Sequence, residues 1–330
     1  MKAWLSDVAG PPATLRLAEV AEPEPGPGEV RVRVAACGLN HADLLLLEDR
    51  YQLRPPRPFA PGAEVAGVVD RVGSGVDALQ PGARVVAVCD WGGLAGCVAV
   101  AATRCLPLPP ELPFEVAAVL PLAYGTARYG LLDCARLAAG ETLLVLGAAG
   151  GVGLAAVQVA KLLGARVVAV VSSEEKAHCA RAAGADACVV QRRAPLDAAA
   201  GRALAAQIKA ACGAGADVVL DPVGGELTEV ALRAVRKGGR YVVAGFAAGI
   251  PSLALNLVLL KQAVVMGAPW GAVVAEGQPA FRATLAALLA AAMSGRLRPH
   301  IGERLSFADA PAGLGRLRDG AVFGKAVVTL

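Results

Sequence analysis

The residues best suited to chemistry form a glycine-dense turn, Gly147-Ala148-Ala149-Gly150-Gly151-Val152-Gly153. A pyrophosphate needs backbone N–H groups and the positive end of a helix dipole within hydrogen-bond distance, and a Cβ in the way prevents that approach. Gly150, Gly151 and Gly153 remove the obstacle. The turn reads A-x-G-x-x-G, with Ala148 where the commonest fingerprint has its first glycine. It therefore predicts a phosphate cradle, although glycines also serve ordinary tight turns.

The elements around the turn decide between these two uses. Leu143 to Leu146 is a short apolar run typical of a strand that is buried on both faces. Apolar residues from Leu154 to Leu163 then recur near helical spacing, Gly164 suits a helix C-cap, and Arg166 to Val171 is a second apolar strand. The order strand, glycine turn, helix, strand favours a dinucleotide-binding unit.

The end of the second strand indicates which dinucleotide is bound. An NAD pocket usually has Asp or Glu there, which accepts a hydrogen bond from the ribose 2′-hydroxyl. This chain has Val171, Ser172 and Ser173, with Lys176 one turn later. Two hydroxyls and an ammonium would hold a 2′-phosphate through charge-assisted hydrogen bonds, so we expect NADPH. The alternative is that Lys176 is simply a solvated helix residue.

Composition limits the remaining function classes. The chain of 330 residues is long enough for two domains, its formal net charge is +4 and its aromatic content is 4%. There is no basic run that would suggest a nucleic-acid surface and no apolar stretch of membrane-spanning length. The N-terminus has neither secretory nor transit character, so we expect a cytoplasmic protein. The eight cysteines lack C-x-x-C pairs and are expected to be reduced thiols.

The texture of the chain changes near Pro113. Before it, alternation over Val30 to Val34 and apolar runs over Glu64 to Val72 and Arg84 to Cys89 predict an antiparallel β-barrel. After it, helices and strands alternate, which predicts a parallel doubly wound sheet with ligands at the carboxyl ends of its strands. Three glycine-rich loops follow strands there, at 147–153, 221–225 and 245–249. The remaining segment is expected to return to the first domain.

A set of motifs in order along the chain carries a family resemblance. These are CGLNHADLLLLEDRY, PFAPGAEVAGVVDRVGSGV, LPLAYGTARYGLL, GAAGGVGLAAVQVAK, SSEEK, DPVGG, AGFAAG, NLVLLK and GKAVV. Together they resemble the quinone oxidoreductase branch of the medium-chain dehydrogenase/reductase superfamily. The resemblance implies an α/β protein with a GroES-like antiparallel β-barrel domain, 1–121 completed by 265–330, and a Rossmann NADPH-binding domain, 122–264. It also implies a substrate cleft between the domains, and a homodimer joined through the edge strand near Val264 to Ala268.

The same resemblance implies roles for individual residues. Asn40 and Tyr51 would lie near the nicotinamide and the substrate, and Thr126 on the nicotinamide side of the cofactor. Ala149, Gly150, Gly151 and Val152 would meet the pyrophosphate. Ser172, Ser173 and Lys176 would meet the 2′-phosphate, with Arg192 in support. The backbone at Gly245 and Phe246 would flank the nicotinamide, and Lys325 would close on the cofactor.

The reaction class depends on whether a metal is present. Zinc-dependent alcohol dehydrogenases share this architecture, and a catalytic zinc needs three protein ligands. Cys37 is present, but Ala63 stands where a histidine would be expected, and we expect no metal site. Without a Lewis acid, an acceptor that delocalises the incoming charge is favoured, such as a quinone or an α,β-unsaturated ketone. Tyr51 or solvent would supply the proton.

Two other functions stay open from the sequence. One is an enoyl-thioester reductase, in which Arg50, Arg54 and Arg57 would hold a phosphopantetheine carrier instead of forming a solvated face. The other is a non-catalytic member of the family that binds NADPH without useful turnover.

Overall fold

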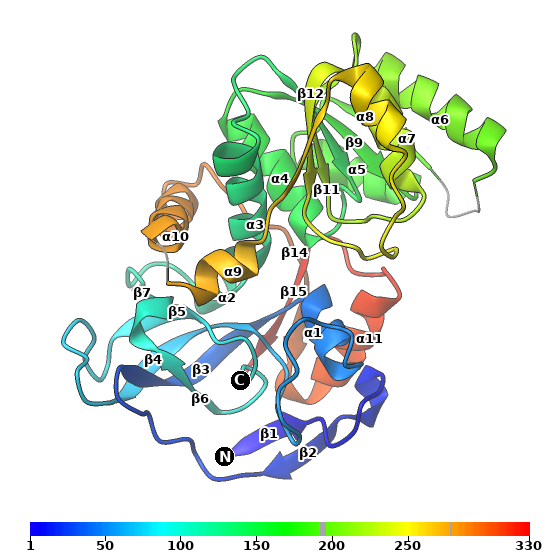
Figure 1. Ribbon diagram of the computed structural model, residues 1–330. Helices are drawn as coiled ribbons and strands as arrows, with labels where there is room; N and C mark the ends of the chain where they lie inside the picture. Colours follow the sequence, from blue (N-terminus) through cyan, green and yellow to red (C-terminus); the bar gives the residue numbers. More distant parts are fainter. Residues whose placement is uncertain (192–195, 278) are drawn as a thin grey trace. The chain divides into compact units, whose positions relative to one another are not determined.

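The computed structural model describes residues 1–191, 196–277 and 279–330, and Figure 1 shows its ribbon. The chain forms two compact units, one made of Met1–Gly125 with Gly271–Leu330 and the other of Thr126–Trp270. The sequence placed the corresponding boundaries after residues 121 and 264. Helices α3 (Gly125–Arg128) and α9 (Trp270–Ala275) lie at the two crossings between the units.

The Rossmann unit, Thr126–Trp270, contains a six-stranded sheet in which every neighbouring pair is parallel. Its strand order is β10-β9-β8-β11-β12-β13. The first strand, β8, lies in the middle of the sheet, the next two strands are added on one side of it, and the last three are added on the other side, beginning with β11. Its strands are β8 Thr142–Leu146, β9 Arg166–Val171, β10 Ala187–Val190, β11 Ala216–Asp221, β12 Val235–Val243 and β13 Val264–Gly267. This is the doubly wound topology expected from the alternation of helices and strands.

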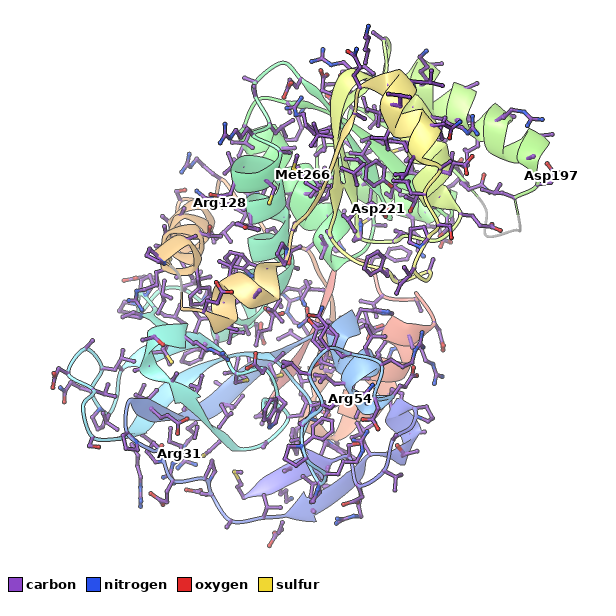
Figure 2. The ribbon with its side chains drawn as sticks, in the orientation of Figure 1. Arg31, Arg54, Arg128, Asp197, Asp221 and Met266 are labelled. Carbon is purple, nitrogen blue, oxygen red and sulfur yellow. The ribbon has the colours of Figure 1, made fainter. Side chains whose placement is uncertain are left out.

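Five helices connect these strands: α4 Gly151–Leu162, α5 Glu174–Ala182, α6 Ala198–Ala211, α7 Leu227–Ala234 and α8 Leu255–Lys261. Asp197, labelled in Figure 2, is the N-cap of α6, and its carboxylate accepts hydrogen bonds from the N–H groups of Ala199 and Ala200. Leu204 and Ile208 are one turn apart and both are buried, so the apolar stripe of this helix faces the core. Burial of such stripes against the sheet stabilises the unit.

The barrel unit, Met1–Gly125 with Gly271–Leu330, contains a seven-stranded sheet and a separate β1–β2 pair. The large sheet has the order β14-β15-β3-β4-β5-β7, and β6 also pairs with β3. Its strands are β3 Glu29–Leu39, β4 Glu64–Val72, β5 Arg84–Val88, β6 Cys97–Ala101, β7 Cys105–Pro107, β14 Ile301–Ser306 and β15 Lys325–Thr329, and the small pair is β1 Lys2–Leu5 with β2 Arg16–Glu19. The helices are α1 His41–Leu47, α2 Phe114–Ala118, α10 Pro279–Met293 and α11 Ala310–Arg318.

The antiparallel character expected for this unit holds for every pair of the large sheet except β14 and β15, which are parallel. Strand β15 pairs antiparallel with the far end of β3, from Leu39 to Ala36. The late segment of the chain therefore completes the sheet that the early segment begins.

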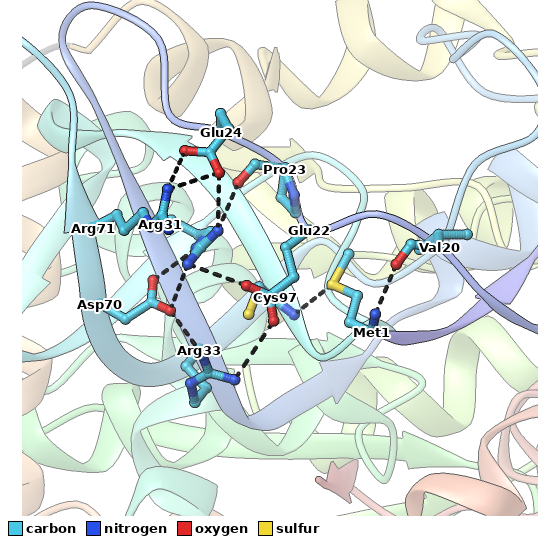
Figure 3. A network of polar contacts seen from close by, with 10 residues as sticks. All are labelled: Met1, Val20, Glu22, Pro23, Glu24, Arg31, Arg33, Asp70, Arg71 and Cys97. Carbon is cyan, nitrogen blue, oxygen red and sulfur yellow. Dashed lines mark hydrogen bonds and ion pairs between the residues drawn. The ribbon is translucent and has the colours of Figure 1, made fainter.

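Buried and exposed side chains do not alternate strictly along β3, because Arg31 belongs to a polar cluster that is drawn in Figure 3. Val30 and Val32 are fully buried and Arg33 is exposed, as a half-buried strand requires. Arg31 is nevertheless only 4% exposed. Its guanidinium binds both carboxylate oxygens of Asp70, at 2.9 and 3.0 Å, and also pairs with Glu22 at 3.1 Å. The segment before β3 covers this cation, which the alternation alone does not predict.

None of the helices formed by the described residues combines the length and the hydrophobicity that crossing a membrane requires.

Candidate functional site

The predicted phosphate cradle lies between β8 and α4 in the Rossmann unit. Gly147 adopts a left-handed φ of 59°, and Gly150 is the N-cap of α4. A Cβ on Gly153 would come within 2.2 Å of the carbonyl oxygen of Gly147, so only glycine fits there. Because Gly150 contributes no capping side chain, the first N–H groups of α4 are available to an anion. Gly150, Gly151 and Val152 reach the surface, whereas Ala149 is 4% exposed.

The predicted 2′-phosphate residues lie together at the end of β9. The Lys176 ammonium donates to Ser172 Oγ at 3.2 Å, so the hydroxyl and the cation form one polar site. Ser173 is the N-cap of α5, and its Oγ accepts the backbone N–H of Lys176 at 3.3 Å. Its hydroxyl therefore has a structural task in addition to any contact with a phosphate. Arg192, expected to support this site, lies outside the described residues.

The two other glycine-rich loops of the Rossmann unit are bonded to each other at the same edge of the sheet. Ala248 N–H donates to the carbonyl of Val223 at 2.7 Å, and Gly225 N–H donates to that of Gly249 at 2.9 Å. Gly245 follows β12, and Phe246 beside it is 48% exposed. An aromatic side chain is thus available at the place where the sequence predicts the nicotinamide.

Thr126 lies in a helical stretch that is not a regular α-helix throughout. The stretch contains π-helical turns at Leu120–Tyr124 and Tyr129–Cys134, with α3 between them. Gly130 packs closely against the sheet, since a Cβ there would come within 3.1 Å of Leu220 and 3.3 Å of Val242. Wide helical turns of this kind occur frequently at functional sites, and Thr126 is half-buried between them.

In the barrel unit the candidate site is built around a buried ion pair. Lys325 Nζ lies 2.8 Å from Glu64 Oε1, and the two side chains are 3% and 0% exposed. The ammonium also donates to the carbonyl of Leu39 at 2.8 Å and to Asn40 Oδ1. Asn40 completes the ring, because its Nδ2 donates to Glu64 Oε1 at 2.9 Å. Asn40 and Lys325, predicted separately, are therefore direct partners.

This geometry bears on the predicted role of Lys325. An ammonium has three N–H donors, and Leu39, Asn40 and Glu64 supply three acceptors. A direct hydrogen bond to a cofactor would have to replace one of these. Sequence reasoning missed Glu64, although an acidic residue opening the apolar strand β4 is a signal, because a buried carboxylate requires a partner.

Asp43 is a second buried carboxylate of the barrel unit that the sequence did not single out. It accepts the backbone N–H groups of Asn40 at 2.7 Å and of Gly62 at 3.0 Å. Burial raises the pKa of this carboxyl to about 6, and the two hydrogen bonds oppose the rise. It fixes the start of α1 and hence the backbone of Asn40 against the Gly62 turn.

Tyr51 stands apart from this ring. It is half-buried, and its hydroxyl has no hydrogen bond to any described residue. Burial, followed by the charges of Asp43 and Asp90, raises the pKa of the phenol. The hydroxyl faces Gly271, where a Cβ would lie 3.8 Å away. Tyr51 therefore offers a protonated O–H group at neutral pH that no described residue binds.

The donor set around Cys37 does not fit a catalytic zinc. Its Sγ is confined by backbone, since a Cβ on Gly62 would lie 2.7 Å from it and one on Gly93 2.9 Å. Burial raises the pKa of the thiol well above its usual value. Ala63 stands beside it where a zinc site would need a histidine. Over the part of the chain that the structure describes, one group of three ligand atoms lies within 4.8 Å, that of Glu22, Asp70 and Cys97. Arg31 already neutralises those carboxylates (Figure 3).

Comparison with protein families matches both units. Residues 26–110 match the alcohol dehydrogenase GroES-like domain, and residues 151–290 match the zinc-binding dehydrogenase model. The chain is 39% identical over 279 residues to quinone oxidoreductase-like protein 2 of Bos taurus, which covers 84% of this chain and 78% of that relative. It is also 36% identical over 324 residues to the spectinabilin polyketide synthase system protein NorB of Streptomyces orinoci, covering 92% of this chain and 13% of that protein.

Among solved structures, the quinone oxidoreductase of Escherichia coli complexed with NADPH is similar over the whole of this chain and the whole of its own, with a TM-score of 0.89 and 26% identity. The GroES-like and Rossmann units expected from the sequence are thus both confirmed. On the strength of these matches, the chain belongs to the quinone oxidoreductase family of the medium-chain dehydrogenase/reductase superfamily, and its curated relatives include the quinone oxidoreductase-like protein 2 type.

Proposed function

We propose that the protein is a zinc-independent reductase that transfers a hydride from NADPH to a quinone or to an α,β-unsaturated ketone. The observation that carries the proposal is the closed ring of Asn40, Glu64 and Lys325 beside Ala63, where the polar groups satisfy one another and offer no three-ligand set for zinc. NADPH as the cofactor is supported by the Ser172–Lys176 pair and by the bound NADPH of the similar Escherichia coli enzyme.

The acceptor class follows from charge. Hydride addition to a quinone produces a hydroquinone monoanion, and addition to an enone produces an enolate, while the cofactor becomes NADP⁺. Both anions delocalise their charge over an oxygen, so hydrogen bonds suffice where a saturated carbonyl would need a Lewis acid. A single proton then completes the hydroquinone or the saturated ketone. Tyr51, with its raised pKa and a hydroxyl that no described residue binds, is the proposed donor.

An enoyl-thioester reductase is the second candidate, because nearly the whole chain resembles part of a polyketide synthase protein. Such an enzyme needs cations to hold a phosphopantetheine carrier. Arg57 is bound to Ser6, Leu47 and Asp49, and Arg50 pairs with Glu48. Of the three arginines named from the sequence, Arg54 (Figure 2) alone has no ion pair with a described residue. This arrangement favours the quinone or enone reductase.

A homodimer is proposed from an exposed apolar surface of the Rossmann unit. Helix α8 exposes Leu255, Leu259 and Leu260 by 72–76%, and the adjacent edge strand β13 exposes Val264 by 51%. Strand β13 pairs only with β12 among the described strands, which leaves one row of backbone groups open. A second copy placed by a two-fold axis would cover both the apolar side chains and the open edge.

The first prediction concerns the acceptor. Steady-state oxidation of NADPH, followed by absorbance, is expected with 1,2- and 1,4-quinones or enones, and is expected to be slower with enoyl thioesters. Turnover confined to enoyl thioesters would establish the second candidate instead. NADPH binding with flat traces for every acceptor would identify a non-catalytic member. Stoichiometric zinc in metal analysis of the active protein would contradict the proposed chemistry.

The second prediction concerns Tyr51. Tyr51→Phe removes the hydroxyl and keeps the ring, and we expect kcat to fall by about a hundredfold, the lower range for a lost general acid. The raised pKa keeps the phenol protonated above its ordinary range, so the wild-type rate should fall only at strongly alkaline pH, and the variant should lack that fall. Tyr124→Phe, which removes a hydroxyl that accepts the His300 N–H, is the matched control. Full turnover of Tyr51→Phe at every pH would remove Tyr51 from the mechanism.

The third prediction concerns the 2′-phosphate. Lys176→Gln is expected to weaken NADPH binding by about tenfold, since a charge-assisted hydrogen bond is lost, while NADH binding stays unchanged. Fluorescence titration of both cofactors measures the ratio. Lys161→Gln is the control, because Lys161 lies in the last turn of α4, at the opposite end from the glycine turn, where it pairs with Asp186. An unchanged NADPH-to-NADH ratio in Lys176→Gln would exclude the proposed contact.

The fourth prediction concerns assembly. Light scattering coupled to size exclusion should give twice the chain mass of 33.2 kDa for the wild type. Leu259→Glu, which places a charge on the exposed face of α8, should give the single-chain mass with unchanged helical circular dichroism. Leu17→Glu introduces the same charge at another exposed leucine, on β2, and should leave the dimer intact. A monomeric wild type, or a dimeric Leu259→Glu, would contradict the proposed interface.

A further inference from the structure

A single buried carboxylate joins four donors at the end of β11. Asp221 is 1% exposed. Its Oδ1 accepts the backbone N–H groups of Val223 and Gly224, both at 2.8 Å. Its Oδ2 accepts the hydroxyls of Thr228 at 2.9 Å and Tyr241 at 2.7 Å. The first two donors belong to the loop that follows β11, and the other two belong to α7 and β12.

The backbone carbonyl of the same residue binds the neighbouring loop. It accepts the N–H groups of Ala244 at 2.8 Å and Gly245 at 3.2 Å. The two loops are then bonded to each other, from Ala248 to Val223 and from Gly225 to Gly249. A Cβ on Gly224 would come within 2.5 Å of the Gly249 carbonyl oxygen, so the loops pack without space for a side chain. Loops 221–225 and 245–249 therefore form one body anchored at Asp221.

The strand order indicates which half of a bound dinucleotide these loops would meet. In a doubly wound sheet a dinucleotide lies across the carboxyl ends of the strands, with its pyrophosphate at the turn after the first strand and its adenosine ribose at the end of the second. These positions are the turn after β8 and the end of β9. The other half must cross the point where strand order reverses and reach the ends of β11 and β12. Asp221, labelled in Figure 2, stands at that end.

We propose that Asp221 is a positioning residue that fixes both loops for the nicotinamide half of NADPH, acting through Val223, Gly224 and Gly245 without touching the reacting atoms. The inference rests on NADPH as the cofactor of the proposed function. A carboxylate suits the task because it accepts from two rigid backbone donors with one oxygen and from two hydroxyls with the other. The hydroxyls belong to Thr228 and Tyr241, which are 3% and 1% exposed, so they hold the carboxylate in place.

The test separates the two halves of the cofactor. Calorimetric titration uses NADPH and 2′,5′-ADP, which carries the adenosine 2′-phosphate and lacks nicotinamide. Asp221→Ala leaves the Val223 and Gly224 N–H groups without their partner, and we expect about tenfold weaker NADPH binding with unchanged 2′,5′-ADP binding. Asp221→Asn, whose oxygen can still accept from both N–H groups while its amide donates to the hydroxyls, should stay within about threefold of the wild type.

Asp217→Ala is the matched control for general destabilisation. Asp217 is 7% exposed at the opposite end of the same strand, where it binds Thr142 N–H at 2.7 Å and Arg236. This variant should lower thermal stability and leave both ligands bound as in the wild type. If Asp221→Ala does not fold, the double variant Thr228→Val with Tyr241→Phe removes both donors to Oδ2 and is expected to show the same selective loss.

Two results would overturn the inference: wild-type NADPH affinity of folded Asp221→Ala, or of the double variant if Asp221→Ala does not fold, and an equal loss of affinity for NADPH and 2′,5′-ADP. A rise in KM for NADPH that exceeds any fall in kcat would support it, because a positioning role acts on binding of the cofactor. Failure of the wild type to bind NADPH at all would instead refute the proposed cofactor, so the two failures are distinguishable.

Discussion

The buried pair of Lys325 and Glu64 is the interaction on which the barrel unit depends most. Removing one partner of such a pair costs about 3–5 kcal/mol, because the other charge is left in a medium of low polarity. The pair is satisfied here by Asn40, by the Leu39 carbonyl and by Leu122 N–H, which donates to Glu64 Oε2 at 2.8 Å. Strand β15, the start of α1 and the π-helical turn Leu120–Tyr124 are therefore located by one charge cluster.

The Rossmann unit also contains a buried carboxylate, that of Asp221, but its hydrogen-bond partners are of a different kind. Among the described residues Asp221 forms no ion pair, and it is satisfied by four neutral N–H and O–H groups. In both units a buried carboxylate stands at a strand end and organises the loops beside it. The apolar strands supply most of the stability, and these polar centres select one loop conformation at the edge where a ligand would bind.

The parts of this arrangement that the sequence predicts are those encoded locally. The glycine turn and the Ser172–Lys176 site each lie within a few residues, and their structural context is readable from the period of the apolar residues. The Asn40–Lys325 contact joins positions 285 residues apart, so spacing along the chain carries no sign of it. The family resemblance pointed to both residues. Only the folded geometry shows that the three N–H donors of the Lys325 ammonium are directed at groups inside the protein. Arg31 is buried although the alternation of β3 predicts that it is exposed. The segment that covers it, which includes Glu22 and Pro23, is not part of the strand, so the pattern of the strand carries no sign of it.

The late position of β15 in the chain has a consequence for synthesis. Residues 126–270 are contiguous, so the Rossmann unit has all its strands once they have left the ribosome. Strand β3 emerges before the Rossmann unit, and its partner Lys325–Thr329 emerges after it. Until β15 has been made, one flank of β3 lacks its partner strand and the carboxylate of Glu64 lacks Lys325. The barrel unit therefore closes only after the Rossmann unit has been made, and until then the open flank of β3 is exposed to incorrect pairing.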